Sequence, residues 1–125
     1  MTVYFNEFAA HPAGWLRNAF PAATVDQRSI ADVRPEDLAG AERAHFFALN
    51  LAGWRGPVWT GSCPCQPFSQ AGDRKGAADH RDLWPVWAAL IRECRPLVVL
   101  GEQVEGAVRH GWLDRVHTDL EAAGY

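Results

Sequence analysis

Two short apolar runs separated by an amphipathic segment constrain the fold of this chain more than any other feature. The runs are residues 57–60 and residues 97–100, and the second is uninterrupted, as in a strand buried in a parallel sheet. Between them, residues 82–94 place apolar side chains at helical spacing, with Asp82 to cap the helix and Pro96 to stop it. Strand, helix and strand in that order predict a right-handed crossover between parallel strands. The sequence therefore predicts an α/β fold whose two strands end at the same edge of a sheet.

Short apolar runs earlier in the chain predict further elements. Three of them are predicted as strands: residues 3–5, 23–25 and 45–48. Apolar side chains around Trp15 fit one face of a helix, with Pro12 tolerated in its first turn. A second helix is predicted to begin at Pro35, because proline and the acids after it favour a first helical turn.

Length and composition narrow the class of protein. The 125 residues suit one modest domain, residues 1–125, and an apolar share of 48% with six tryptophans predicts a folded core. No apolar run has the length of a membrane span and the N-terminus lacks a signal-peptide pattern, so we expect no membrane partner. Three cysteines, an odd number, fit a reducing cytoplasm better than a disulfide scaffold. With a net charge of −3, a chain that acts on DNA would need most of its phosphate contacts from elsewhere.

A cysteine between two prolines is the strongest chemical signal. Cys65 lies in Gly-Ser-Cys-Pro-Cys-Gln-Pro-Phe-Ser, residues 61–69, just past the first apolar run, and Pro64 and Pro67 stiffen the backbone around it. Loops at the carboxyl ends of strands are where open α/β sheets place their chemistry. We interpret Cys65 as a nucleophile, which requires its thiolate form. The alternative for any cysteine is a small buried hydrophobe, and Cys94, on the apolar face of the predicted helix, fits that interpretation.

A carboxylate is expected beside this thiol. Glu102 follows the strand at residues 97–100, so parallel pairing would bring it to the edge where Cys65 lies. An acid there can protonate a ring nitrogen while the thiolate attacks the electron-poor ring. Alternatively, Glu102 is a solvated carboxylate that caps the next helix. A zinc site is the other competitor, but its spacing is unusual and no metal is expected; its ligands would be Cys63, Cys65, Cys94 and His80.

Three segments together resemble the DNA cytosine-5 methyltransferases. Residues 61–69 resemble the family's Pro-Cys-Gln catalytic loop, and Gln-Ala-Gly and a basic Arg-Lys pair follow. Residues 79–84 resemble the next family segment, in which an Asp-x-Arg pattern opens a helix. Residues 100–104 resemble the Glu-Asn-Val motif, with Gln103 in place of asparagine. The matches cover about residues 57–105, and their shared spacing makes them specific as a set.

The resemblance implies a fold and a reaction. The fold would be a partial Rossmann-like sheet of the S-adenosylmethionine-dependent methyltransferase type, mostly parallel and flanked by helices. Cys65 would attack carbon 6 of a cytosine flipped out of double-stranded DNA, because the stacked ring shields that atom. Glu102 would engage ring nitrogen 3, carbon 5 would take the methyl group, and elimination would release the enzyme. Arg81 would help to place the base or a phosphate, although an ion pair with Asp79 or Asp82 is an open alternative; Gln66 and Ser69 would shape the loop that meets the substrate.

The resemblance also assigns the methyl donor, S-adenosyl-L-methionine, to the first half of the chain. Glu7 resembles the strand-end acid that binds the ribose hydroxyls, and Asp26 the next acid, which contacts the adenine; alone, either would be an ordinary turn residue. Phe47 and Pro64 would complete the donor contacts. The family's Phe-x-Gly-x-Gly loop is absent, and close backbone approach is costly without glycine. We therefore expect donor binding to be impaired.

The sequence reaches Tyr125 without the family's target-recognition domain. We accordingly expect an incomplete catalytic domain with weak or no methyl transfer alone, aided by a complementing chain that carries the target-recognition domain. The expected location is the cytoplasm of a bacterial or phage-infected cell. A non-catalytic remnant, or one part of a split methyltransferase, is one alternative, and a cysteine-dependent enzyme acting on small molecules is another.

Overall fold

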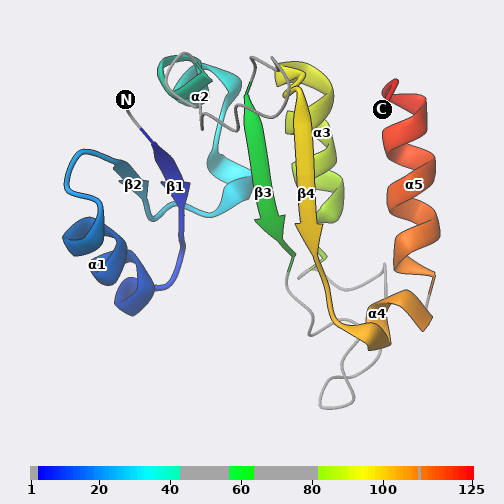
Figure 1. The fold of residues 1–125 in the computed structure, drawn as a ribbon, viewed down its shortest axis with the longest axis horizontal. Helices are drawn as coiled ribbons and strands as arrows, with labels where there is room; N and C mark the ends of the chain where they lie inside the picture. The colour runs from blue at the N-terminus through cyan, green and yellow to red at the C-terminus, as the bar shows by residue number, and fades with distance from the viewer. Residues whose placement is uncertain (1–2, 43–56, 64–81, 110) are drawn as a thin grey trace, which may run out of the picture.

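The computed structural model describes residues 3–42, 57–63, 82–109 and 111–125 (Figure 1). Short strands alternate with helices along these residues, as an α/β fold requires. In chain order the elements are β1 (Tyr4–Asn6), α1 (Ala10–Ala19), β2 (Thr24–Asp26), the 3-10 helix η1 (Ile30–Asp32), α2 (Pro35–Glu42), β3 (Val58–Ser62), α3 (Trp84–Cys94), β4 (Val98–Glu102), α4 (Glu105–Arg109) and α5 (Trp112–Ala122). The run at residues 45–48 lies outside the described residues.

The predicted parallel pair is confirmed. Strands β3 and β4 pair in parallel, with Val58 opposite Val98 at one end and Ser62 opposite Glu102 at the other. Figure 1 shows the two arrows side by side and pointing the same way. Each strand extends two residues beyond its apolar run, because main-chain pairing continues through Gly61 and Gly101. The carboxyl ends of both strands therefore lie at one edge.

Helix α3 joins these strands but begins differently from the prediction. Its N-cap residue is Leu83, whose side chain makes no capping hydrogen bond, while Asp82 accepts from the Trp84 N–H at 3.3 Å. The Asp82 carboxylate is also bound by Arg115 of α5, a stronger, charge-assisted partner. At the other end Arg95 adopts a left-handed conformation, with φ of 54°, and Pro96 prevents the helix from continuing.

The first half of the chain forms its own small sheet. Strands β1 and β2 pair in parallel, with Asn6 opposite Asp26. Among the described strands, β1–β2 and β3–β4 are separate two-stranded sheets, so the expected single sheet is not formed by these residues. Parallel strands flanked by helices are confirmed, and the Rossmann-like order stays a prediction.

Helix α1 covers β2 with less apolar surface than the sequence suggested. Its fully buried residue is Ala13, whereas Trp15 is 62% exposed. Phe20, just past the helix, packs against Phe5 of β1, with their ring centroids 5.3 Å apart. A small side chain at the contact lets the helix approach the strands, which leaves the larger aromatic ring outside.

The main core lies between the β3–β4 sheet and helices α3, α4 and α5. Its centre is a set of tryptophans in edge-to-face contact. The ring centroid of Trp84 lies 5.8 Å from that of Trp87 and 5.8 Å from that of Trp112. Trp87 packs directly on the strands, and a Cβ added at Gly61 would lie 2.5 Å from its ring. A glycine is required there for the helix to lie this close to the sheet. No helix in the described part of the chain is long and apolar enough to span a membrane.

Candidate active site

The site is centred on the last residue pair of the β3–β4 ladder. Ser62 and Glu102 are opposite one another in register, and the Ser62 hydroxyl donates to Oε2 of Glu102 at 2.8 Å. Both side chains are exposed, so the carboxylate stands at the surface where the chain leaves β3. Cys65 follows Ser62 by three residues in the sequence. The acid predicted from one motif thus contacts a residue three positions before the cysteine of the other.

Gln103 makes a second contact between the two strand exits. Its Nε2 donates to the carbonyl oxygen of Cys63 at 3.2 Å, and its Oε1 accepts from the N–H of Val104 at 2.9 Å. Gln103, rather than Glu102, therefore makes the polar contact that precedes α4. The sequence carried a signal for this role, because glutamine keeps the amide of the asparagine it replaces, with one donor and one acceptor group.

Cys63 is distinguished from Cys65 by its surroundings. It is 9% exposed and belongs to the core cluster around Trp84 and Trp87. Burial, reinforced by the negative charge of Asp82 and opposed by Arg115, raises the pKa of the Cys63 thiol to about 11. At neutral pH this thiol remains protonated and is a packing residue, because the thiolate is the reactive form.

Asp82, the first described residue after Cys63, takes part in a buried ion pair. The Asp82 carboxylate is 3% exposed, and two guanidinium nitrogens of Arg115 donate to its oxygens at 2.6 and 2.9 Å. Both charges act on the Cys63 thiol, so the residues that flank segment 64–81 lie near one another. This pairing was not predicted, because its two partners are 33 positions apart in the sequence.

Other predicted site residues lie outside the described part of the chain, and their roles stay predictions: Phe47, Pro64, Cys65, Gln66, Ser69 and Arg81. Cys65 and His80, two of the four residues weighed as zinc ligands, also lie outside the described residues. Within the described ranges, no three histidine, cysteine or acidic side chains are grouped to hold a metal ion. Cys94 is half-buried and packs against the cluster around Leu90, as its helical position predicted.

A second edge brings the two predicted donor-binding acids together. Glu7 directly follows β1, and its N–H donates to the carbonyl oxygen of Asp26, the last residue of β2, at 2.9 Å. The Glu7 carboxylate accepts from the N–H of Ala9 at 2.8 Å and so supports the start of α1. Neighbouring strand ends with an acid each are a common arrangement for nucleotide binding in α/β folds.

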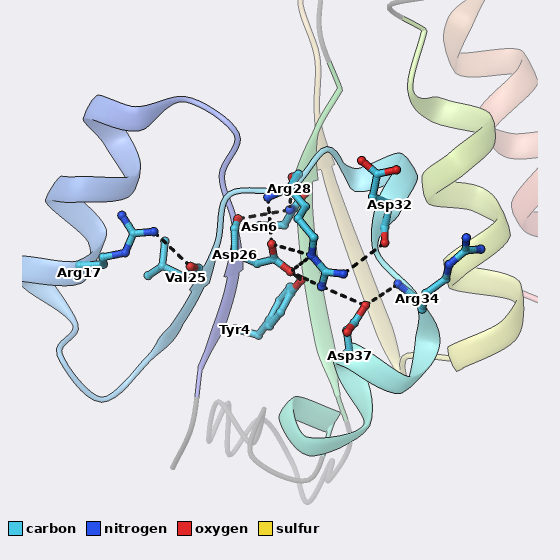
Figure 2. Close-up of polar contacts among 9 residues, drawn as sticks. All are labelled: Tyr4, Asn6, Arg17, Val25, Asp26, Arg28, Asp32, Arg34 and Asp37. Atoms are coloured by element: carbon cyan, nitrogen blue, oxygen red, sulfur yellow. Dashed lines mark hydrogen bonds and ion pairs between the residues drawn. The ribbon is translucent and has the colours of Figure 1, made fainter.

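The Asp26 carboxylate is held within the protein (Figure 2). Oδ2 accepts from the Tyr4 hydroxyl at 2.8 Å, and the Arg28 guanidinium contacts both carboxylate oxygens, the shortest contact being 2.6 Å. These hydrogen bonds, led by those of Arg28, hold the pKa of Asp26 well below its usual range. Arg28 also reaches Asp37 of α2 at 3.0 Å. Sequence reasoning missed Tyr4 and Arg28, although the Asp-x-Arg spacing was a local signal for the second.

The second half of the chain, which contains β3, β4 and the Ser62–Glu102 pair, matches a known protein family. The profile of the C-5 cytosine-specific DNA methylase family matches residues 54–125, which include β3, the Cys65 loop and Glu102. The chain belongs to this family of DNA-modifying enzymes.

The chain is also similar to individual type II methyltransferases. It is 40% identical over 112 residues to the type II methyltransferase M.AluI of Cellulosimicrobium cellulans, across 83% of this chain and 21% of that protein. It is 34% identical over 70 residues to M.AplI of Arthrospira platensis, across 54% of this chain and 20% of that protein. The chain therefore spans about a fifth of the length of these relatives.

Proposed function

We propose that this chain carries the nucleophile loop and the acid of a DNA (cytosine-5) methyltransferase. The observation that supports this most is the Ser62–Glu102 pair, which sets the motif acid beside the end of β3, three residues before Cys65 in the sequence. Membership of the cytosine-5 methylase family supplies the substrate class. The chain spans about a fifth of the length of its relatives, so the proposal concerns these two groups and not the activity of a whole relative.

The chemistry follows from the two groups. The Cys65 thiolate would form a sulfur–carbon bond to carbon 6 of a flipped cytosine, while Glu102 hydrogen-bonds or protonates ring nitrogen 3 and takes up the charge that develops there. Carbon 5 thereby becomes nucleophilic and accepts a methyl group. Transfer of the carbon 5 proton to water and cleavage of the sulfur–carbon bond then restore the aromatic ring and the thiolate, and any proton held on nitrogen 3 returns to Glu102. Base flipping would expose carbon 6 to this attack.

S-adenosyl-L-methionine would supply the electrophilic methyl group, and the second edge suits it in part. Glu7 is half-buried, and a carboxylate that accepts one backbone hydrogen bond retains capacity for ribose hydroxyls. The Asp26 oxygens already accept from Tyr4 and Arg28, so an adenine amino group would compete with charge-assisted bonds. We therefore propose that Glu7 is the main donor contact and that binding is weak. Titration calorimetry tests this proposal, and a tight complex would contradict it.

DNA binding would rely on additional polypeptide. The chain has a net charge of −3, whereas phosphate contacts come from lysine and arginine. We propose that the target-recognition function is supplied by further protein, in the same polypeptide or on a complementing chain. Mixing with such a chain and measuring methylation tests this part independently of the chemistry at Cys65.

The decisive experiment is trapping of a covalent adduct. Duplex DNA with 5-fluorocytosine in varied sequence contexts is incubated with the chain and the methyl donor at low salt, where phosphate contacts are strongest. We expect a shifted band on a denaturing gel, which is lost in Cys65→Ala and reduced in Glu102→Gln. The matched control is Cys63→Ala, which should keep the adduct because that thiol is buried and protonated. Because the isolated chain is proposed to bind both the donor and DNA weakly, the proposal is contradicted if folded protein forms no adduct even with saturating methyl donor and a complementing chain.

A non-catalytic role is the second candidate, and the Asp26 network favours it. A carboxylate that holds β1, β2 and α2 together has a structural use without any ligand. In that case neither the adduct nor donor binding should be observed, while the chain still folds. The two assays above separate this candidate from the enzyme.

A further inference from the structure

The Ser62–Glu102 contact is built into the strand ladder. The two residues form the last register pair of β3 and β4, and side chains paired in this way project from the same face of a sheet. The Ser62 hydroxyl donates to Oε2 of Glu102 at 2.8 Å. Both side chains are exposed, so without this bond the long glutamate side chain would sample several rotamers in solvent.

The backbone beneath the contact is firmly supported. Gly61 and Gly101, the preceding register pair, both lie against Trp87, which is 6% exposed; a Cβ at Gly61 would fall 2.5 Å from the Trp87 ring. The strand pair is thus pressed onto α3 one residue before the site. A hydroxyl on such a rigid element can orient its partner better than one on a loop.

Resting on the proposed function, we propose that Ser62 is a positioning residue for the Glu102 carboxylate. Its hydroxyl holds Oε2, so the contact with the pyrimidine ring falls to Oε1, whose direction is then set by the ladder. Ser62 itself touches no reacting atom in this scheme. Its effect on the reaction is therefore expected in the chemical step and not in the affinity for DNA.

The test compares Ser62→Ala with the conservative variant Ser62→Thr, which keeps a hydroxyl and suits a strand. Adduct formation with 5-fluorocytosine DNA is measured as a function of DNA concentration. We expect Ser62→Ala to lower the rate at saturating DNA by about tenfold, with the half-saturating DNA concentration unchanged, and Ser62→Thr to restore the rate to within about twofold. In the Glu102→Gln background, Ser62→Ala should add much less, because the two residues act as a unit.

The outcomes separate the two proposals. If the wild-type chain forms an adduct and Ser62→Ala forms it equally fast, the positioning role is wrong while the proposed function stands. If Ser62→Thr fails to restore the rate, or if the loss appears only as weaker DNA binding, the positioning role is also overturned. If the folded wild-type chain forms no Cys65-dependent adduct even with saturating methyl donor and a complementing chain, the proposed function fails and the inference on Ser62 fails with it. Urea unfolding midpoints of the variants, expected to match the wild type within about 0.3 M, exclude a folding defect as the cause.

Discussion

The contact between Trp87 and the paired glycines makes a sharp prediction about stability. In Gly61→Ala the new methyl group would lie 2.5, 2.6 and 2.9 Å from three atoms of the Trp87 ring. Carbon atoms rest at about 3.5–4.0 Å, so the ring or the strand has to move by about 1 Å. Trp87 is 6% exposed and is in edge-to-face contact with Trp84, which leaves little room for that movement.

The size of the effect follows from two opposing contributions. Overpacking a core contact costs about 1–3 kcal/mol. Replacing glycine by alanine in an allowed conformation returns about 0.4–1 kcal/mol, because the unfolded chain loses freedom. Neither Gly61 nor Gly101 has the positive φ that would strain an alanine. We therefore expect Gly61→Ala to lower the free energy of unfolding by about 1–2 kcal/mol.

Gly101→Ala is the matched control. Gly101 lies opposite Gly61 in register, yet a Cβ added at Gly101 would lie 4.0 Å from the Trp87 ring, which is an ordinary contact distance. Its stability should stay unchanged or rise by up to about 1 kcal/mol. Urea unfolding followed by tryptophan fluorescence should therefore give midpoints that differ by about 1 M, since m is about 1–3 kcal/mol/M for small proteins. Equal midpoints for the two variants would refute the packing argument.

Three further perturbations test the polar network and the buried thiol. Arg115→Leu leaves the Asp82 carboxylate buried without its partner. Urea denaturation should show that the free energy of unfolding falls by about 3 kcal/mol, near the low end for buried pairs because Arg115 is partly exposed. A fall below about 1 kcal/mol would show that solvent screens the pair. The pKa of Cys63 is raised from 9.0 to about 11, so the protonated thiol stabilises the fold fully below pH 9. As pH rises toward 11, this contribution to the free energy of unfolding falls by about 2 kcal/mol. Cys63→Ala should therefore make thermal stability less dependent on pH across that range. The pKa of Asp26 is depressed, so its contribution is present above about pH 4 and declines at lower pH; Asp26→Asn should remove part of the acid-side decline, and an unaltered pH profile would contradict this.

Local pattern was enough to predict the elements that carry the site. The apolar runs at residues 57–60 and 97–100, with the helix between them, predicted β3, α3 and β4 and their shared edge, because strand and helix periodicity are properties of neighbouring residues. The acids Glu7 and Asp26 were likewise placed correctly at strand ends. The spacing of the motifs also predicted the family, and the family profile covers the residues of those motifs.

What the local pattern could not supply was the partner of each polar group. The exposed Trp15 shows the limit for packing, since an apolar face on α1 does not say which residue reaches the core. For Asp26, only the folded chain brings the Tyr4 hydroxyl, 22 positions away, onto the carboxylate.

The amino-acid sequence by itself determined the strand–helix–strand unit, the placement of acids and cysteine after strands, and the family. Tertiary structure alone decided that Ser62 opposes Glu102 in register and that Gly61 is the residue on which Trp87 packs. The physical reason is the range of the interactions. Helix and strand formation depend on residues a few positions apart, whereas the Ser62–Glu102 bond joins residues 40 positions apart. It forms because the packing of α3 on both strands sets which residues meet.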